Sequence, residues 1–165
     1  MTPCPRGRRA YLPNVTELAP SEVRRRVLSG HQVLREQLLA LRKACSELGA
    51  DGEDDFTSIR LRAEAVRDAL EAQIEVEANI LAPVLEETPG FGEIRCEELA
   101  AHHVAQRRLF SEFVSMLDPA RPPRGFTDRA CEVLDLLRRE LVWEDRELLD
   151  PDVVKDDTID ISLGG

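Results

Sequence analysis

Six polar side chains fall on the apolar stripes of the helices that the hydrophobic pattern predicts, at matching depths along those helices. They are His31, Gln73, Glu77, His103, Glu140 and Glu144. The glutamine and the first glutamate are four residues apart, and so are the last two glutamates, so each pair occupies one helix face, one turn apart. Each pair follows a helix with one inward histidine. The same arrangement therefore occurs twice along the chain.

Buried carboxylates need a partner, because an isolated ionised carboxylate inside a protein costs several kcal/mol or takes up a proton. Three glutamates and two histidines at one depth indicate a shared cause. A pair of divalent cations supplies one, because carboxylates can bridge two cations and imidazoles can fill the remaining positions. We therefore predict a two-metal site. Its predicted ligands are His31, Glu77, His103, Glu140 and Glu144.

Three of the polar residues have a competing interpretation. His102 and His103 are adjacent, so both cannot face inward equally; His103 is favoured because it shares a stripe with Phe110, and His102 stays an alternative ligand. Glu140 could instead pair with a nearby arginine. Gln73 fits a hydrogen-bonding neighbour of the ligands better than a ligand.

Four segments have apolar residues at helical spacing, and none alternates like a strand. The predicted helices are Ser21–Leu48, Thr57–Glu86, Gly92–Leu117 and Asp128–Leu149. Ser21 and Thr127 are the predicted N-caps, and Pro83 should kink or end the second helix. Four helices with short links are typical of an antiparallel up-down four-helix bundle, an all-α fold. The predicted organisation is an extended arm over 1–20, the bundle over 21–153 and a tail over 154–165.

The composition and charge of the chain disfavour some classes of binding partner. The chain has 165 residues, a formal charge of -10 and a pI of about 4.9. Such an acidic chain does not suit nucleic acid, which needs a basic surface, and we expect no membrane partner. No apolar run approaches the roughly 20 residues that span a bilayer. The four cysteines are scattered and form no C-x-x-C pair, which favours a reducing, cytoplasmic setting.

The helix sequences are similar to those of hemerythrin-like (HHE cation-binding) domains. The similar segments are SGHQVLREQLLALRKA, LEAQIEVEANILAPVLEE, ELAAHHVAQRRLFSEF and LLRRELVWEDRELLDPDV, one from each predicted helix. The resemblance extends from about Ser21 to Val153. It implies a hemerythrin-like bundle with two non-heme iron ions. The positions that match the family's ligands are His31, Glu77, His103 and Glu144, and the two glutamates among them match its bridging carboxylates.

The chain departs from that family at Gln73 and Glu140, which stand where the family has histidine. An added carboxylate favours the ferric state, so the resemblance implies reaction with an oxidant rather than reversible dioxygen carriage. Our first hypothesis is a protein that reacts with or senses dioxygen, peroxide or nitric oxide. One alternative is a di-iron oxidase or oxygenase acting on a small organic substrate, and another is a structural bundle without metal. Manganese or a mixed metal pair would suit the same ligands.

Overall fold

The computed structural model describes residues 18–48, 53–118 and 122–154, and all regular structure in these ranges is helical. Its elements are α1 (Pro20–Ser46), α2 (Glu53–Val76), the π-helical turn η1 (Glu77–Leu81), α3 (Ala82–Glu86), α4 (Gly92–Ser115) and α5 (Phe126–Glu147). Because α2, η1 and α3 follow one another without a break, the described residues form four long helical segments. The predicted all-helical bundle is confirmed at this level.

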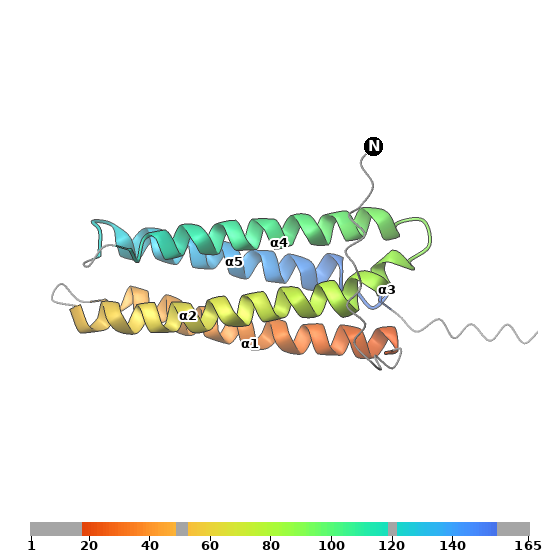
Figure 1. Ribbon diagram of the computed structural model, residues 1–165, viewed down its shortest axis with the longest axis horizontal. Coiled ribbons are helices and arrows are strands. Elements are labelled where there is room, and N and C mark those ends of the chain that lie inside the picture. Colours follow the sequence, from red (N-terminus) through yellow and green to blue (C-terminus); the bar gives the residue numbers. More distant parts are fainter. Residues whose placement is uncertain (1–17, 49–52, 119–121, 155–165) are drawn as a thin grey trace, which may run out of the picture.

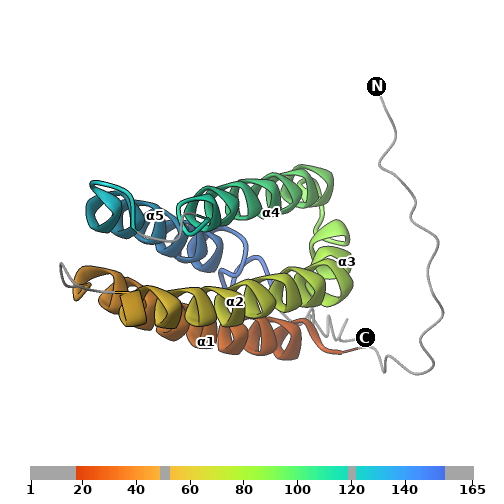
Figure 2. The same ribbon diagram turned by 60° about the vertical axis from the view of Figure 1, so that its left-hand side comes forward.

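The four segments lie lengthwise beside one another. In both views α1 and α2 form one pair and α4 and α5 another (Figures 1 and 2), and α1 also packs against α5. α3 packs against the first part of α4 at one end of the bundle. No helix of the described part of the chain is long and apolar enough to cross a bilayer.

Both predicted N-caps are wrong. α1 begins at Pro20 after Ala19, so Ser21 lies inside the helix. Proline is favoured in the first turn, because its fixed φ is already helical and its missing N–H would have had no partner there. α5 begins at Phe126 after Gly125, whose φ of +74° few other residues adopt, so Thr127 also lies inside its helix.

The irregularity predicted at Pro83 is present as the π-helical turn η1 before it. Here the backbone N–H of Ala82 bonds to the carbonyl of Glu77, five residues earlier. Proline has no N–H to donate, and its ring would collide with the carbonyl four residues before it, that of Asn79. Widening the preceding turn accommodates the ring, and the helix continues to Glu86. Such turns are frequent at functional sites, and this one begins at a predicted metal ligand.

Two apolar clusters fill the interior. The larger includes Leu34, Leu38, Phe56, Ile59, Leu70, Phe110, Phe113, Leu134, Leu137 and Leu141. The smaller contains Val23, Val27, Leu81, Leu85, Leu99, Leu148, Leu149 and Val154. Val154, the first residue of the predicted tail, is thus buried in the bundle. The rest of that tail, 155–165, and residues 1–17 of the predicted arm lie outside the described residues.

Candidate metal centre

A layer of buried polar side chains separates the two apolar clusters. Its members are His31, Gln73, Glu77, His103, Gln106 and Glu144. On α1, His31 lies between Val27 of the smaller cluster and Leu34 of the larger. Glu144 on α5 likewise has buried leucines about one turn before and after it. Helical spacing therefore positions this layer, since a residue one turn from two core residues faces the same interior.

Glu77 is the centre of the layer. Its Oε1 atom lies 2.6 Å from Nε2 of His31, and its Oε2 atom lies 2.7 Å from Nε2 of His103. Gln73, one turn earlier, donates a 2.7 Å hydrogen bond from Nε2 to Oε1. A single carboxylate thus faces imidazoles from α1 and α4 with its two oxygens, an arrangement that would also suit a carboxylate shared by two cations.

Glu144 has one oxygen with a partner and one without. Its Oε1 accepts a 2.8 Å hydrogen bond from Nε2 of Gln106. Its Oε2 is buried without a hydrogen-bond partner and lies 3.4 Å from Nε2 of His31. Leaving such an atom unsatisfied typically costs about 1–3 kcal/mol. A cation beside it would remove that cost, and the donor set offers one: ligand atoms of His31, Glu77 and Glu144 lie within 4.8 Å of one another.

The charges of this layer are strongly coupled. Burial by itself would lower the pKa of His31, but hydrogen bonds to Asp145 and Glu77 outweigh it and raise that pKa to about 9. Burial would raise the pKa of Glu77, but hydrogen bonds from His103 and His31 hold it below its ordinary value. Burial and the negative charge of Glu77 raise the pKa of Glu144. Ionisation is thus favoured at Glu77 and disfavoured at Glu144.

Of the remaining predicted residues, some lie in the polar layer and others lie outside it. His103 is the buried member of the histidine pair, whereas His102 is only partly buried. His102 stacks on Trp143, with ring centres 3.9 Å apart, and its Nδ1 lies 2.7 Å from Oε2 of Glu140. The partner of Glu140 is therefore a histidine and not the arginine considered above, and Glu140 lies outside the group of three residues that could hold a metal ion. Its ligand role stays a prediction.

Two residues of the site had no predicted role. Gln106 lies on the same helix face as His103, three residues on, so its inward position could be anticipated but not its bond to Glu144. Asp145 could not be found from periodicity, because it is only half-buried. Its Oδ1 lies 2.6 Å from Nδ1 of His31, which is 114 residues away in the chain, and its Oδ2 pairs with Arg35.

Gly30 makes room for Gln73. A Cβ atom at Gly30 would stand 1.8 Å from Oε1 of Gln73. The Gln73 amide also reaches the backbone of α1, with its Nε2 3.4 Å from the carbonyl of Val27. The absence of a side chain at position 30 therefore lets this amide lie between two helices and hold Glu77.

This contact gives a test by double substitution. Gly30→Ala should gain about 1 kcal/mol of helix propensity but displace the Gln73 amide, so we expect little net change in the free energy of unfolding. In a Gln73→Ala background nothing is displaced, and the same substitution should stabilise by about 1 kcal/mol. Urea unfolding of the four proteins measures the difference. Equal effects of Gly30→Ala in both backgrounds would show that the two residues do not interact.

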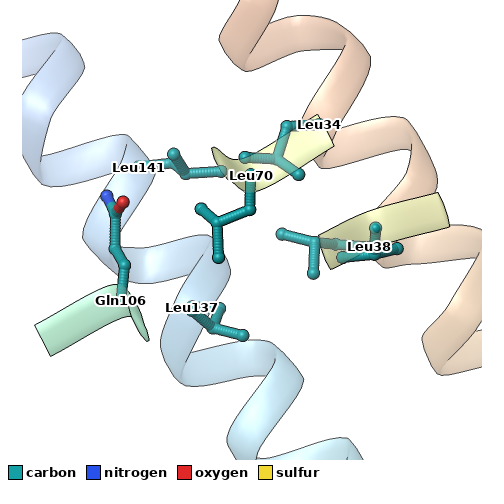
Figure 3. A pocket seen from close by; sticks show the side chains of 7 residues that line it. Leu34, Leu38, Leu70, Gln106, Leu137 and Leu141 are labelled. Atoms are coloured by element: carbon teal, nitrogen blue, oxygen red, sulfur yellow. The ribbon is translucent and has the colours of Figure 1, made fainter. Parts of the chain in front are cut away.

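An apolar gap adjoins the polar layer. It is lined by Leu34, Leu38, Val66, Leu70, Gln106, Leu137 and Leu141. In Figure 3 leucines from α1, α2 and α5 face one another, and Gln106 of α4 stands beside them. The gap is too narrow to take a water molecule. It therefore has no room for an organic substrate.

Comparison with known proteins adds nothing to these observations: no protein-family model, curated protein or solved structure matches the chain.

Proposed function

We propose that this chain is an antiparallel up-down, hemerythrin-like bundle that binds non-heme iron in its polar layer and reacts with or senses dioxygen, peroxide or nitric oxide. The observation that supports this most is the group of His31, Glu77 and Glu144, in which Oε2 of Glu144 is buried without a hydrogen bond. One imidazole and two carboxylates suit iron or manganese better than softer metals. Among the described residues that oxygen has no hydrogen-bond partner, and its ion-pair contact is with His31, itself a proposed ligand, so a cation bound between them would serve both groups.

Two ions of unequal affinity fit the arrangement best. The first would be held by the three clustered ligands. The second would have Oε2 of Glu77 and Nε2 of His103, which already lie 2.7 Å apart. Glu140 would complete this second set only after leaving His102, so we expect the second ion to dissociate first. Glu77 would be shared by both ions.

The protein's own residues prepare this reaction in three ways. Apolar clusters on both sides of the layer keep bulk water away from it. Gln73 and Gln106 hold the two carboxylates by amide hydrogen bonds. His31 gives up the proton that lies between its Nε2 and Glu77 when a cation takes that position. Bound iron would supply electrons and an open position for a small oxidant.

The gap beside Gln106 favours a small oxidant over an organic substrate. A di-iron oxidase or oxygenase needs space for its substrate beside the metals, and this gap does not admit even water. Dioxygen, nitric oxide and peroxide are larger than water, but the gap would have to widen far less to admit them than to admit an organic substrate. We therefore propose the sensing or oxidant-reacting function and not the oxygenase.

Iron loading tests the proposal. Metal-free protein is incubated with Fe(II) without oxygen and desalted, and iron is measured before absorption spectra are recorded with and without dioxygen, peroxide or nitric oxide. We expect up to two irons per chain and a spectral change with at least one oxidant or nitric oxide. Glu77→Gln should lose the iron, because the shared carboxylate is gone. Glu75→Gln, at an exposed position two residues away, is the matched control.

Two results would contradict the proposal at different points. If the wild-type chain retains no iron, the alternative of a structural bundle without metal would be supported. Retained iron whose spectrum responds to none of the three small molecules would leave a metal-binding protein without the proposed reactivity.

A further inference from the structure

His31 has a partner at each ring nitrogen. Nε2 faces the metal group, 2.6 Å from Oε1 of Glu77, and Nδ1 faces the opposite way, 2.6 Å from Oδ1 of Asp145. The His31 side chain is 1% exposed, whereas that of Asp145 is 21% exposed. Asp145 therefore lies on the outer side of the imidazole, between the polar layer and the surface of the bundle.

Asp145 is itself held in place. Its Oδ2 pairs with the guanidinium of Arg35, which follows His31 by one turn on α1. Because Arg35 and His31 share one face of α1, the carboxylate of Asp145 on α5 bridges two successive turns of that helix. The two oxygens are thereby fixed, one on an imidazole and one on a guanidinium.

Asp145 and Glu144 have different tasks although they are neighbours in the sequence. Successive residues of an α-helix point about 100° apart, so both cannot enter the polar layer. Glu144 is the buried one and contributes to the metal group, whereas Asp145 projects sideways towards α1. Its carboxylate reaches the site only through His31.

The tautomer of a metal-binding histidine decides which nitrogen is available. A neutral imidazole has one N–H and one lone pair, and a hydrogen bond from one nitrogen leaves the other as ligand. A carboxylate that accepts the N–H also makes the imidazole a more basic ligand. The contact from Nδ1 to Asp145 meets this requirement, since it leaves Nε2 to face Glu77 and Glu144.

We propose that Asp145, held by Arg35, is a positioning residue that keeps a proton on Nδ1 of His31 and directs Nε2 towards the cation. It acts through His31 and does not bind the metal. The inference rests on the proposed function for the presence of a cation, but the hydrogen bond to Asp145 can be measured without one.

The chain contains a matched control for this contact. Arg42 and Asp135 form a second ion pair between the same two helices, with Nε of the arginine 2.8 Å from Oδ1 of the aspartate. Within the described part of the chain, the carboxylate of Asp135 pairs with Arg42 and Arg138 and not with an imidazole. Replacing Asp135 therefore removes an α1–α5 ion pair and leaves His31 unchanged, so it separates loss of helix pairing from loss of histidine positioning.

The experiment compares wild type, Asp145→Ala, Asp145→Asn and Asp135→Ala. In metal-free protein labelled with ¹⁵N-histidine, the Nδ1 proton of His31 should resonate far downfield and exchange slowly in wild type and Asp135→Ala. It should be lost in Asp145→Ala. Zn²⁺ affinity, measured by competition with a coloured chelator, should fall about 10–100-fold in Asp145→Ala and stay near wild type in Asp135→Ala. Asp145→Asn keeps an acceptor without charge and should be intermediate.

The outcomes separate this inference from the proposed function. Wild-type binding of Zn²⁺ with unchanged affinity in both Asp145 variants would overturn the positioning role alone, as would an unchanged Nδ1 proton in Asp145→Ala. Wild-type protein that binds neither Zn²⁺ nor Fe²⁺ would overturn the proposed function. If Asp145→Ala does not fold, as judged by circular dichroism, the comparison between Asp145→Asn and Asp135→Ala decides the matter.

Discussion

Replacing Glu144 by glutamine should stabilise the metal-free protein and at the same time abolish its tight metal binding. The first effect follows from the burial of the Glu144 carboxyl and from the nearby charge of Glu77, both of which raise the pKa of that carboxyl. Both make an ionised Glu144 unfavourable in the folded state. Glutamine has nearly the same shape and no charge, and its carbonyl can still accept the hydrogen bond from Gln106.

The two effects should be large enough to measure separately. Removing the charge of this buried carboxyl should raise the free energy of unfolding by about 1–3 kcal/mol in the presence of chelator, since one pKa unit corresponds to about 1.4 kcal/mol. Metal affinity should fall by more than about 100-fold, because loss of a residue that only supports a ligand already costs about 10–100-fold. Urea unfolding of metal-free protein gives the first quantity, and chelator competition with Zn²⁺ or Fe²⁺ gives the second.

Opposite signs are the informative part of this prediction. Replacing a residue that is retained for packing would destabilise the protein. A residue that is retained for binding a cation can instead lower the stability of the metal-free protein, so its replacement can raise that stability. Glu147→Gln is the control, since that side chain is exposed on the same helix. If Glu144→Gln lowered stability and left Zn²⁺ affinity as in wild type, Glu144 would be a structural residue and not a ligand.

The helices and the depth of the polar layer could be predicted from the sequence because both depend on periodicity alone. A residue one turn from buried leucines must face the same side, so His31, Glu77 and Glu144 were found without knowledge of the fold. Helix starts were missed because they depend on local backbone preference. Proline at the first turn of α1 and glycine with positive φ before α5 determine them, and not side-chain capping by Ser21 and Thr127.

Contacts within the layer could not be predicted, because periodicity gives a direction and not a partner. Glu140 shares a face with Glu144, yet it pairs with His102 at the edge of the bundle. Asp145 has a half-exposed position that periodicity treats as surface, yet it contacts the buried His31. Both contacts depend on which side chains of a neighbouring helix come within reach, and this is known only from the packed structure.

The metal-free protein should lose stability as the pH rises from about 6.5 to about 9, and its metal affinity should rise over the same interval. The pKa of His31 is raised from its ordinary 6.5 to about 9 in the folded state. Its stabilising contribution is therefore complete below about pH 6.5 and is lost as the pH rises through about 9. The raised pKa of Glu144 acts in the same direction, because the folded state holds a proton that the unfolded chain releases earlier.

The acid side has the opposite sign. The pKa of Glu77 is lowered in the folded state, so its contribution is complete above its ordinary 4.5 and is lost as the pH falls below that value. Because the contribution of Glu144 begins to be lost above its ordinary pKa of 4.5, maximum stability of the metal-free protein should lie near pH 4.5. The loss from His31 alone towards pH 9 should be on the order of 3 kcal/mol, since one pKa unit corresponds to about 1.4 kcal/mol, and the loss from Glu144 adds to it.

A cation should reverse this dependence, because it replaces the protons of His31 and Glu144 and its binding becomes easier as they leave. Thermal unfolding across the interval should show a falling midpoint with chelator present and a flatter one with Zn²⁺ bound. The metal-free Glu144→Gln protein should have a shallower dependence than wild type, since one of the two titrating groups is gone. If the thermal unfolding midpoint of metal-free wild type does not decrease as the pH rises from about 6.5 to about 9, His31 and Glu144 hold no extra protons in the folded state. Cation binding would then not require the release of protons from these two residues.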